Sequence, residues 1–361
     1  MRKKKGLWAS VTGYLRHIFV DGLSGMAMGL FATLIVGTIL AQLSTYIPGT
    51  IGYYIGACAS LAKALTGAGI GVGVAAKYKR SPLAVVSCAV AGLVGAFSSK
   101  IIAGTVLTEG AVLLAGPGEP LGAFLAAFTA AEIGGLVSGK TKLDILLTPL
   151  ACIASGSAVG LLIGTPISRM MTALGDLINW GTVQQPILMG VVVSVLMGMA
   201  LTLPISSAAI GVILGLSGTA AGAACIGCCT QMVSFAVMSY RENRFGGLVA
   251  QGVGTSMLQM PNIVRNPRIW FPPILASAVL GPVSTLLHME CNATGAGMGT
   301  SGLIGPIMTY QTMTASGSAA GWVLAEIVLL YFAAPAALTL IAALPMRRLG
   351  WIGEGDLKLN V

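Results

Sequence analysis

The sequence is almost emptied of charge along its whole length, and this feature constrains the fold most. Of 361 residues only 9% are charged, whereas 55% are hydrophobic, and the mean hydropathy is +0.89. Soluble domains carry about 25% charged residues, because water must solvate their surface. The chain therefore predicts an integral membrane protein whose solvent is lipid. Polar side chains inside its apolar runs are costly there, so they should mark function.

The remaining composition fits helices in lipid. Fifty glycines suit helices that pack closely, because small residues let backbones approach. The net charge of +9 is explained by basic residues that flank spans on the cytoplasmic side, so we predict no nucleic-acid partner. The seven cysteines lie mostly inside apolar segments, where they behave as small hydrophobic residues, and their odd number gives no disulfide framework. No cofactor and no metal are expected.

Stretches long enough to cross a bilayer recur along the chain. A membrane-spanning helix needs about 20 mostly apolar residues. Two further segments, 246–262 and 295–314, are apolar but short and rich in glycine, which predicts re-entrant or broken segments. Between 205 and 239, two short spans or one long bent helix fit equally well. The candidate spans are 22–46, 51–75, 82–107, 121–138, 143–167, 186–203, 205–223, 225–239, 270–289 and 319–345.

Basic clusters indicate how the spans are oriented. When the start of the chain is placed inside, nearly every later basic cluster returns to the same side, as the positive-inside rule requires. The clusters are Arg2–Lys5, Lys77–Arg80, Lys140–Lys142, Arg241–Arg244 and Arg347–Arg348. We therefore predict an all-α integral membrane protein of about ten transmembrane helices plus two re-entrant or broken segments, with both termini cytoplasmic.

The pattern predicts three parts. They are a basic cytoplasmic N-terminus over 1–21, a multi-span membrane domain over 22–345, and a short cytoplasmic tail over 346–361. No loop exceeds about twenty residues, which leaves no room for an ATPase or a phosphate-relay domain with its own core. Whatever energises the protein is expected to act from another chain or through an ion gradient.

The densest polar signal lies between residues 251 and 262. Gln251, Thr255, Ser256, Gln259 and Asn262 alternate there with glycine and methionine. Amides and hydroxyls both donate and accept hydrogen bonds, which is how a pre-formed pocket recognises sugar hydroxyls. The alternative is polar contacts that hold helices together, at about 0.6 kcal/mol each. Five such residues in one short segment favour a substrate site.

Two other polar residues interrupt apolar surroundings. Glu119 stands between prolines and glycines just before a helix, and Pro120 suits the first helical turn. It is either a solvated loop residue or a carboxylate presented to a polar substrate. Gln231 follows the cysteine-rich run 225–229, whose Cys-x-x-Cys is better explained by small packing residues than by metal or redox chemistry. An amide in the middle of a span needs a partner, so Gln231 is a candidate binding residue.

A third polar group lies near the end of a predicted span. His288, Glu290 and Asn292 precede a flexible glycine-rich stretch. His288 and Glu290 could form a proton relay or bind a hydroxyl as it is deprotonated. They could equally be interfacial residues, because a spacing of two does not place them on one helical face. We predict a functional role for at least one of them.

Several segments together resemble the membrane-embedded IIC-like family of the phosphoenolpyruvate-dependent sugar phosphotransferase system. The branch concerned includes predicted toxin-regulator membrane proteins of Gram-positive bacteria. The resemblance runs over roughly 19–348, and the long segment 251–262 is its most specific part. The segments are Gly118–Pro120, Leu143–Pro149, Pro204–Ala209, Tyr240–Asn243 and Gln251–Asn262.

The resemblance implies a sugar-translocating subunit in the bacterial cytoplasmic membrane. A separate cytoplasmic IIB protein, served by a IIA protein, would supply the phosphoryl group, so phosphotransferase activity would need those proteins. Family members of better-known branches are homodimers that hold the sugar with Glu, His and amide side chains. Candidates for docking an acidic or phosphorylated partner are Arg241, Arg244, Arg265 and Arg268, which topology explains equally well.

Two alternatives stay open. One is an ion-coupled or uncoupled transporter of the same architecture, in which intramembrane Glu and His serve proton coupling. The other is a membrane sensor that regulates gene expression through a partner and binds its ligand without transporting it.

Overall fold

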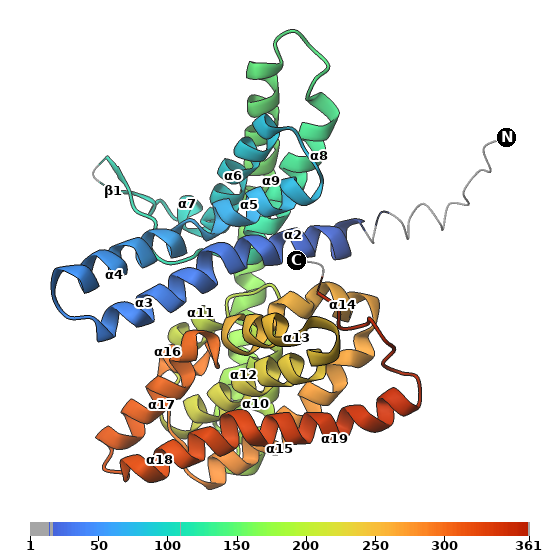
Figure 1. The fold of residues 1–361 in the computed structure, drawn as a ribbon. Coiled ribbons are helices and arrows are strands. Elements are labelled where there is room, and N and C mark those ends of the chain that lie inside the picture. Colours follow the sequence, from blue (N-terminus) through green and yellow to red (C-terminus); the bar gives the residue numbers. More distant parts are fainter. Residues whose placement is uncertain (1–13, 15–16, 109, 360–361) are drawn as a thin grey trace. The chain divides into compact units, whose positions relative to one another are not determined.

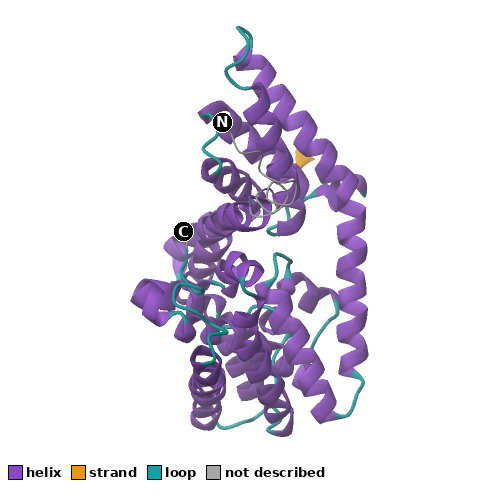
Figure 2. Ribbon diagram, turned by 90° about the vertical axis from the view of Figure 1, so that its right-hand side faces the viewer, coloured by secondary structure: helices purple, strands orange, loops and turns teal. Residues whose placement is uncertain are grey.

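The computed structural model describes residues 14, 17–108 and 110–359, and helices make up most of this part of the chain (Figure 2). Much of the predicted basic N-terminus therefore lies outside the described residues. The described chain divides into two compact units. The first takes in the chain up to Gly37 together with Ser60–Ile167, and the second takes in Thr38–Ala59 together with Ser168–Leu359.

The first unit packs four helices against one another: α2, α5, α6 and α8. Proline opens two of them, as expected: Pro82 begins α6 after Ser81, whose hydroxyl accepts from the backbone N–H of Ala84, and Pro120 begins α8 after Glu119. The helices α3 (Val36–Tyr46), α4 (Gly49–Ala64) and α9 (Asp144–Thr182) run from one unit into the other (Figure 1). The elements of the first unit are η1 (His17–Gly22), α2 (Leu23–Leu30), η2 (Phe31–Ile35), α5 (Thr66–Lys77), α6 (Pro82–Ala96), α7 (Ser98–Ile102), β1 (Leu107–Thr108), β2 (Ala111–Val112) and α8 (Pro120–Val137).

Glycines bring α2 and α5 into backbone contact. Each helix carries a pair of glycines one turn apart, Gly25 and Gly29 in α2, and Gly69 and Gly73 in α5. A Cβ atom on Gly29 would lie 2.2 Å from the carbonyl oxygen of Gly69, and one on Gly73 would lie 2.2 Å from that of Gly25. No side chain fits in this interface, so the small residues are required for the two helices to pack as they do.

An ion-pair cluster closes one end of the first unit. Glu132 of α8 accepts from Arg80 Nη2 at 2.6 Å and lies 3.1 Å from His17 Nε2. The His17 ring stacks on Tyr78, whose hydroxyl donates to the His17 carbonyl oxygen at 2.9 Å. Burial, and then the Glu132 carboxylate, raise the pKa of Tyr78, so the phenol stays protonated and keeps this hydrogen bond.

Glu132→Gln is expected to destabilise the protein by about 2 kcal/mol, because it removes a charge-assisted hydrogen bond from a half-buried guanidinium. Thermal unfolding of the purified protein in detergent measures this loss. In a double-mutant cycle, Arg80→Gln added to Glu132→Gln should cost less than the two single losses combined. Strict additivity would show that the pair contributes nothing.

The second unit is arranged around α12, which packs against α10, α15 and α19 and is buried along nearly its whole length. Several glycines of this group allow no side chain, Gly227 and Gly281 among them. A Cβ atom on Gly227 would lie 1.9 Å from the carbonyl oxygen of Ser194, and one on Gly281 would lie 2.1 Å from that of Gly190. The helices of the second unit are α10 (Pro186–Thr202), α11 (Ser207–Ile213), α12 (Gly218–Met238), α13 (Tyr240–Val249), η3 (Ala250–Gly254), η4 (Ser256–Gln259), α14 (Met260–Arg265), η5 (Pro267–Trp270), α15 (Phe271–Leu286), α16 (Ala293–Ala296), η6 (Ser301–Leu303), α17 (Ile304–Ala315), α18 (Ala320–Ile327), η7 (Val328–Ala333) and α19 (Ala334–Arg348).

An all-α membrane protein is confirmed, but fewer helices qualify as spans than the ten expected. Six described helices are long and apolar enough to cross a membrane, or seven if Gly49–Ala64 and Thr66–Lys77 form one bent span. Pro82–Ala96 and Pro186–Thr202 are apolar but shorter. A count of ten, the orientation of the termini and the three-part division stay predictions.

The structure also shows how the less regular segments are built. The region 205–239, which fitted two short spans or one bent helix, forms the short α11 followed by the 21-residue α12. Both segments predicted to be broken are interrupted helices. The first passes from α13 through a π-helical and a 3₁₀ turn into α14, and the second joins α16 to α17 through a 3₁₀ turn.

Candidate functional site

Three predicted amides form a buried hydrogen-bonded chain in the second unit. Gln251 Nε2 donates to Ser239 Oγ at 2.7 Å and to the Gly247 carbonyl oxygen at 2.9 Å. Gln259 Nε2 donates to Gln251 Oε1, and Asn262 Nδ2 donates to Gln259 Oε1, each at 2.8 Å. The structure therefore brings together the amides of the segment on which the sequence prediction rested.

A break in the helix makes this chain of amides possible. Thr255 is extended, with φ −162°, and its Oγ1 accepts from the Met257 backbone N–H at 3.2 Å, which starts the 3₁₀ turn Ser256–Gln259. This local side-chain bond replaces the helical ladder that the turn interrupts. The turn carries Gln259 back toward Gln251, eight residues earlier.

The polar side chains of Gln231, Thr202, Ser256 and Trp270 form a second buried group. Gln231 Oε1 accepts from Trp270 Nε1 at 3.0 Å and from Thr202 Oγ1 at 3.4 Å, while the hydroxyl oxygens of Thr202 and Ser256 lie 2.8 Å apart. Gln231 is 0% exposed, yet its Nε2 has no hydrogen-bond partner among the residues that the structure describes. A buried N–H without a partner is costly, so this amide is poised to bind an acceptor.

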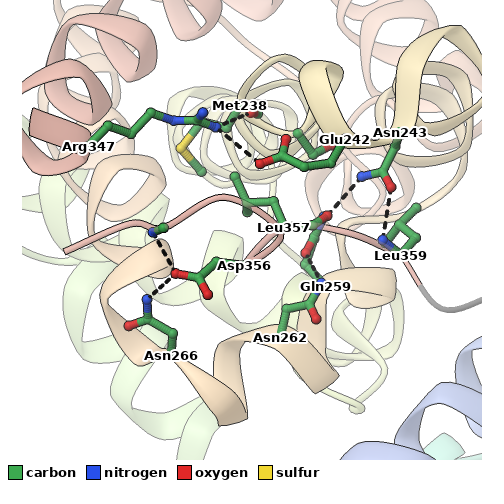
Figure 3. A network of polar contacts seen from close by, with 12 residues as sticks. Met238, Glu242, Asn243, Gln259, Asn262, Asn266, Arg347, Asp356, Leu357 and Leu359 are labelled. Carbon is green, nitrogen blue, oxygen red and sulfur yellow. Dashed lines mark hydrogen bonds and ion pairs between the residues drawn. The ribbon is translucent and has the colours of Figure 1, made fainter. Parts of the chain in front are cut away.

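The amide chain also binds the C-terminal segment 351–359, called the tail below (Figure 3). Gln259 Nε2 donates to the Leu357 carbonyl oxygen at 3.0 Å, and Asn262 Nδ2 donates to the Lys358 carbonyl oxygen at 3.0 Å. These partners lie 98 and 96 residues further along the chain. Two of the predicted substrate amides therefore hold the protein's own backbone in this conformation.

Two further asparagines hold the tail, and the sequence interpretation missed both. Asn243 Nδ2 donates to the Leu357 carbonyl oxygen at 2.8 Å, and its Oδ1 accepts from the Leu359 backbone N–H at 2.9 Å. Asn266 Nδ2 donates to Asp356 Oδ2 at 2.7 Å (Figure 3). It also donates to the Trp351 carbonyl oxygen at 2.9 Å. The side chain of Leu357 is fully buried in a cluster with Phe235, Ile263, Ile269 and Met346.

The other predicted site residues do not join these two groups. Glu119 lies in the first unit at the start of α8, where its backbone N–H donates to the Ala96 carbonyl oxygen at 2.7 Å. Among described contacts, no hydrogen bond joins His288, Glu290 and Asn292. His288 is exposed with φ +53°, Glu290 Oε2 accepts from Ser316 at 3.4 Å, and Asn292 caps α16.

The four arginines predicted to dock a partner are all exposed. They come from the neighbouring elements α13, α14 and η5 of the second unit. Arg265 Nη1 donates to Asn262 Oδ1 at 3.4 Å, and the Arg268 guanidinium lies 5.7 Å from the centre of the Trp351 ring. Both therefore contact residues of the tail or of the amide chain. Arg241 and Arg244 lie in α13, and Arg244 has φ +53°.

The cysteines form no metal-binding group among the described residues. All seven are free thiols, and Cys58 is exposed whereas the others are buried. In the cysteine-rich run, Cys228 Sγ lies 3.4 Å from the Met197 carbonyl oxygen and 3.5 Å from that of Ala296, which fits a packing role.

The structure thus defines a multi-span helical membrane protein whose second unit buries polar side chains between apolar helices. Such groups between helices are typical of transport proteins. The family model described as Phosphotransferase system, EIIC, matches residues 20–359, and the chain belongs to this family. It is a membrane component of phosphotransferase-type sugar transport, as the resemblance implied. A comparison with curated proteins finds no match.

Proposed function

We propose that this protein carries one carbohydrate across the bacterial cytoplasmic membrane by alternating access and presents it to a separate IIB protein, which is served by IIA. The observation that carries the site is the unpartnered amide of Gln231 in the middle of a buried helix. The family supplies the reaction class, and the buried amide supplies a donor for a sugar hydroxyl.

The contacts around Gln231 prepare it for this role. The Trp270 N–H and the Thr202 hydroxyl both donate to Oε1, so the amide group is oriented with its N–H₂ directed away from them. Ser256 adds a hydroxyl next to Thr202, and such a group can both donate and accept. Donors and acceptors fixed by packing recognise a polyhydroxyl ligand at a low entropic cost.

Other candidates belong to the same proposed pathway. Gln259 and Asn262 now bind tail carbonyl oxygens, and we propose that a sugar hydroxyl takes that place during transport. The remaining proposed substrate contacts are Glu119, Gln251, Thr255, His288, Glu290 and Asn292. The exposed arginines Arg241, Arg244, Arg265 and Arg268 are proposed to dock the phosphorylated partner, and the working form is proposed to be a homodimer.

Gln231→Met is expected to reduce sugar uptake by about tenfold to a hundredfold, since a hydrogen bond to a substrate contributes about 1–3 kcal/mol. The measurement is uptake of a panel of labelled sugars and polyols by protein reconstituted in vesicles, with and without the host's IIA and IIB proteins. Phosphorylated product should appear only when those proteins are present.

Ser277→Ala is the matched control. Ser277 is also fully buried in the second unit, but its hydroxyl donates within its own helix to the Pro273 carbonyl oxygen at 2.9 Å. It should transport at the wild-type rate. Equal losses in both variants would show that Gln231 acts through packing, and tight binding of a sugar with no flux would favour a sensor.

One observation favours the ion-coupled alternative. Glu326 lies in α18, inside an apolar span, and is 8% exposed. Its Oε2 has no hydrogen-bond partner within the described chain. An intramembrane carboxyl group of this kind suits proton uptake and release. Unmodified sugar accumulating with a proton gradient, without IIA or IIB and lost in Glu326→Gln, would establish this mechanism instead.

A further inference from the structure

A groove of about 100 Å³ lies between α19 and the junction of α12 with α13. Its walls are mainly apolar, with Val237 on one side and Leu340, Ala343 and Leu344 on the other. Arg241 and Arg347 complete it. Neither the proposed transport pathway nor the amide chain uses this groove.

The sequence places the apolar and basic lining residues in the same order on both sides. On α19, Leu340, Leu344 and Arg347 follow one another at helical spacing and share one face. Across the groove, Val237 lies at the end of α12, and Arg241 lies four residues later at the start of α13. Each side therefore runs from aliphatic side chains to an arginine, as an amphiphilic ligand would require.

The position of the arginines fits the edge of a bilayer. Ala320–Arg348 is a 29-residue apolar helical segment. At about 1.5 Å per residue it measures about 43 Å, which exceeds the hydrocarbon thickness of about 30 Å. Arg347 stands at its end, so it reaches the headgroup region, while Leu340 and Leu344, which are 45% and 54% exposed, lie within the span.

The charges at this end of the groove favour an anion. Arg347 Nη2 donates to the Met238 carbonyl oxygen at 2.7 Å and lies 3.7 Å from Glu242 Oε1, which hold the guanidinium in place (Figure 3). Arg241 is exposed and has no partner in the described part of the chain. Two arginines thus line this end of the groove, and the one carboxylate bound there is that of Glu242, so the local charge is positive.

We propose that this groove binds one anionic phospholipid. Arg241 and Arg347 bind its phosphodiester, because the planar guanidinium matches phosphate oxygens. An acyl chain lies along Val237, Leu340 and Leu344. A soluble phosphate would make no use of these apolar walls. A soluble protein would have to enter the bilayer to reach them.

Native mass spectrometry of the full-length protein in detergent, titrated with phosphatidylglycerol, tests whether the arginines bind the lipid phosphate. Arg241→Gln is expected to weaken binding about fivefold, as expected for one arginine near an anionic lipid headgroup. Arg348→Gln is the matched control, because it removes the same charge from an exposed neighbour that does not line the groove. Wild-type protein should bind phosphatidylcholine less tightly than phosphatidylglycerol.

A bulky substitution in the apolar part of the groove tests whether an acyl chain lies there. Leu344→Trp should abolish the tight phosphatidylglycerol adduct by occupying the place of the acyl chain. Ile341→Trp adds the same side chain at a 65% exposed position of α19 outside the groove and should leave binding unchanged. Circular dichroism and size-exclusion profiles identify any variant that fails to fold, and the Arg241→Gln comparison does not depend on a bulky substitution.

Three outcomes would overturn the proposal. Equal losses in Arg241→Gln and Arg348→Gln would show nonspecific charge attraction. Competition by inorganic phosphate at lipid-equivalent concentration would show a soluble-anion site. Unchanged lipid binding in Arg241→Gln would show that Arg241 does not bind the phosphodiester, whether or not it also docks IIB.

Discussion

Gly227→Ala is expected to lower the stability of the second unit by about 3 kcal/mol, at the upper end of the range for overpacked cores. The added methyl carbon would lie 1.9 Å from the Ser194 carbonyl oxygen, and the obstacle is backbone, which no rotamer change relieves. The helices α10 and α12 must then separate, which loosens the centre of the unit. Unfolding by heat or by denaturing detergent measures the loss.

Gly321→Ala is the control for this substitution. Gly321 lies in the helix α18, and a Cβ atom there meets no atom within 4 Å. Alanine should therefore stabilise the helix by about 0.5–1 kcal/mol, through its better helix propensity. If both variants lost stability equally, the close approach of α10 and α12 would not be the cause.

Leu357→Ala is expected to cost about 3 kcal/mol, because the side chain is fully buried and its removal leaves a cavity. The loss acts on the tail, which is held by hydrogen bonds to its backbone and by two buried side chains, Ile352 and Leu357. Faster hydrogen exchange at the Leu359 backbone N–H, which donates to Asn243, should accompany the lower unfolding temperature.

Lys358→Ala tests whether the side chain or the tail backbone matters. The Lys358 side chain is exposed, and its carbonyl oxygen would still accept from Asn262. Stability should stay within about 0.5 kcal/mol of wild type. A large loss here, with none in Leu357→Ala, would contradict the packing described for the tail.

The apolar spans could be predicted because a helix that crosses a bilayer needs about 20 mostly apolar residues, and such stretches are visible in the sequence. The stretch 22–46 lies within the continuous helical run His17–Tyr46, and 121–138 is α8 within one residue. The stretch 82–107 is less regular than predicted, since α6 ends at Ala96 and is followed by the five-residue α7 and two short strands. The division between α11 and α12 falls at Gly215 and Gly218, which both have positive φ. Hydropathy does not detect such a backbone requirement.

The polar groups were predictable one segment at a time, but their partners were not. Gln251, Gln259 and Asn262 lie close in sequence, so a local pattern could indicate that they act together. The carbonyl oxygens that they bind belong to a tail almost a hundred residues away, and Trp270 is 39 residues from Gln231. Backbone acceptors carry no residue signature, so only tertiary structure can assign them.

The single exposed thiol allows the depth of one helix in the membrane to be measured without mutation. Because Cys58 is exposed and the other cysteines are buried, a nitroxide reagent should modify one position without any engineered change. Collision of that spin label with oxygen, which partitions into lipid, and with a water-soluble nickel complex would report how far α4 sits from the headgroups. The depth of this one position would then test whether Gly49–Ala64 and Thr66–Lys77 form one bent span.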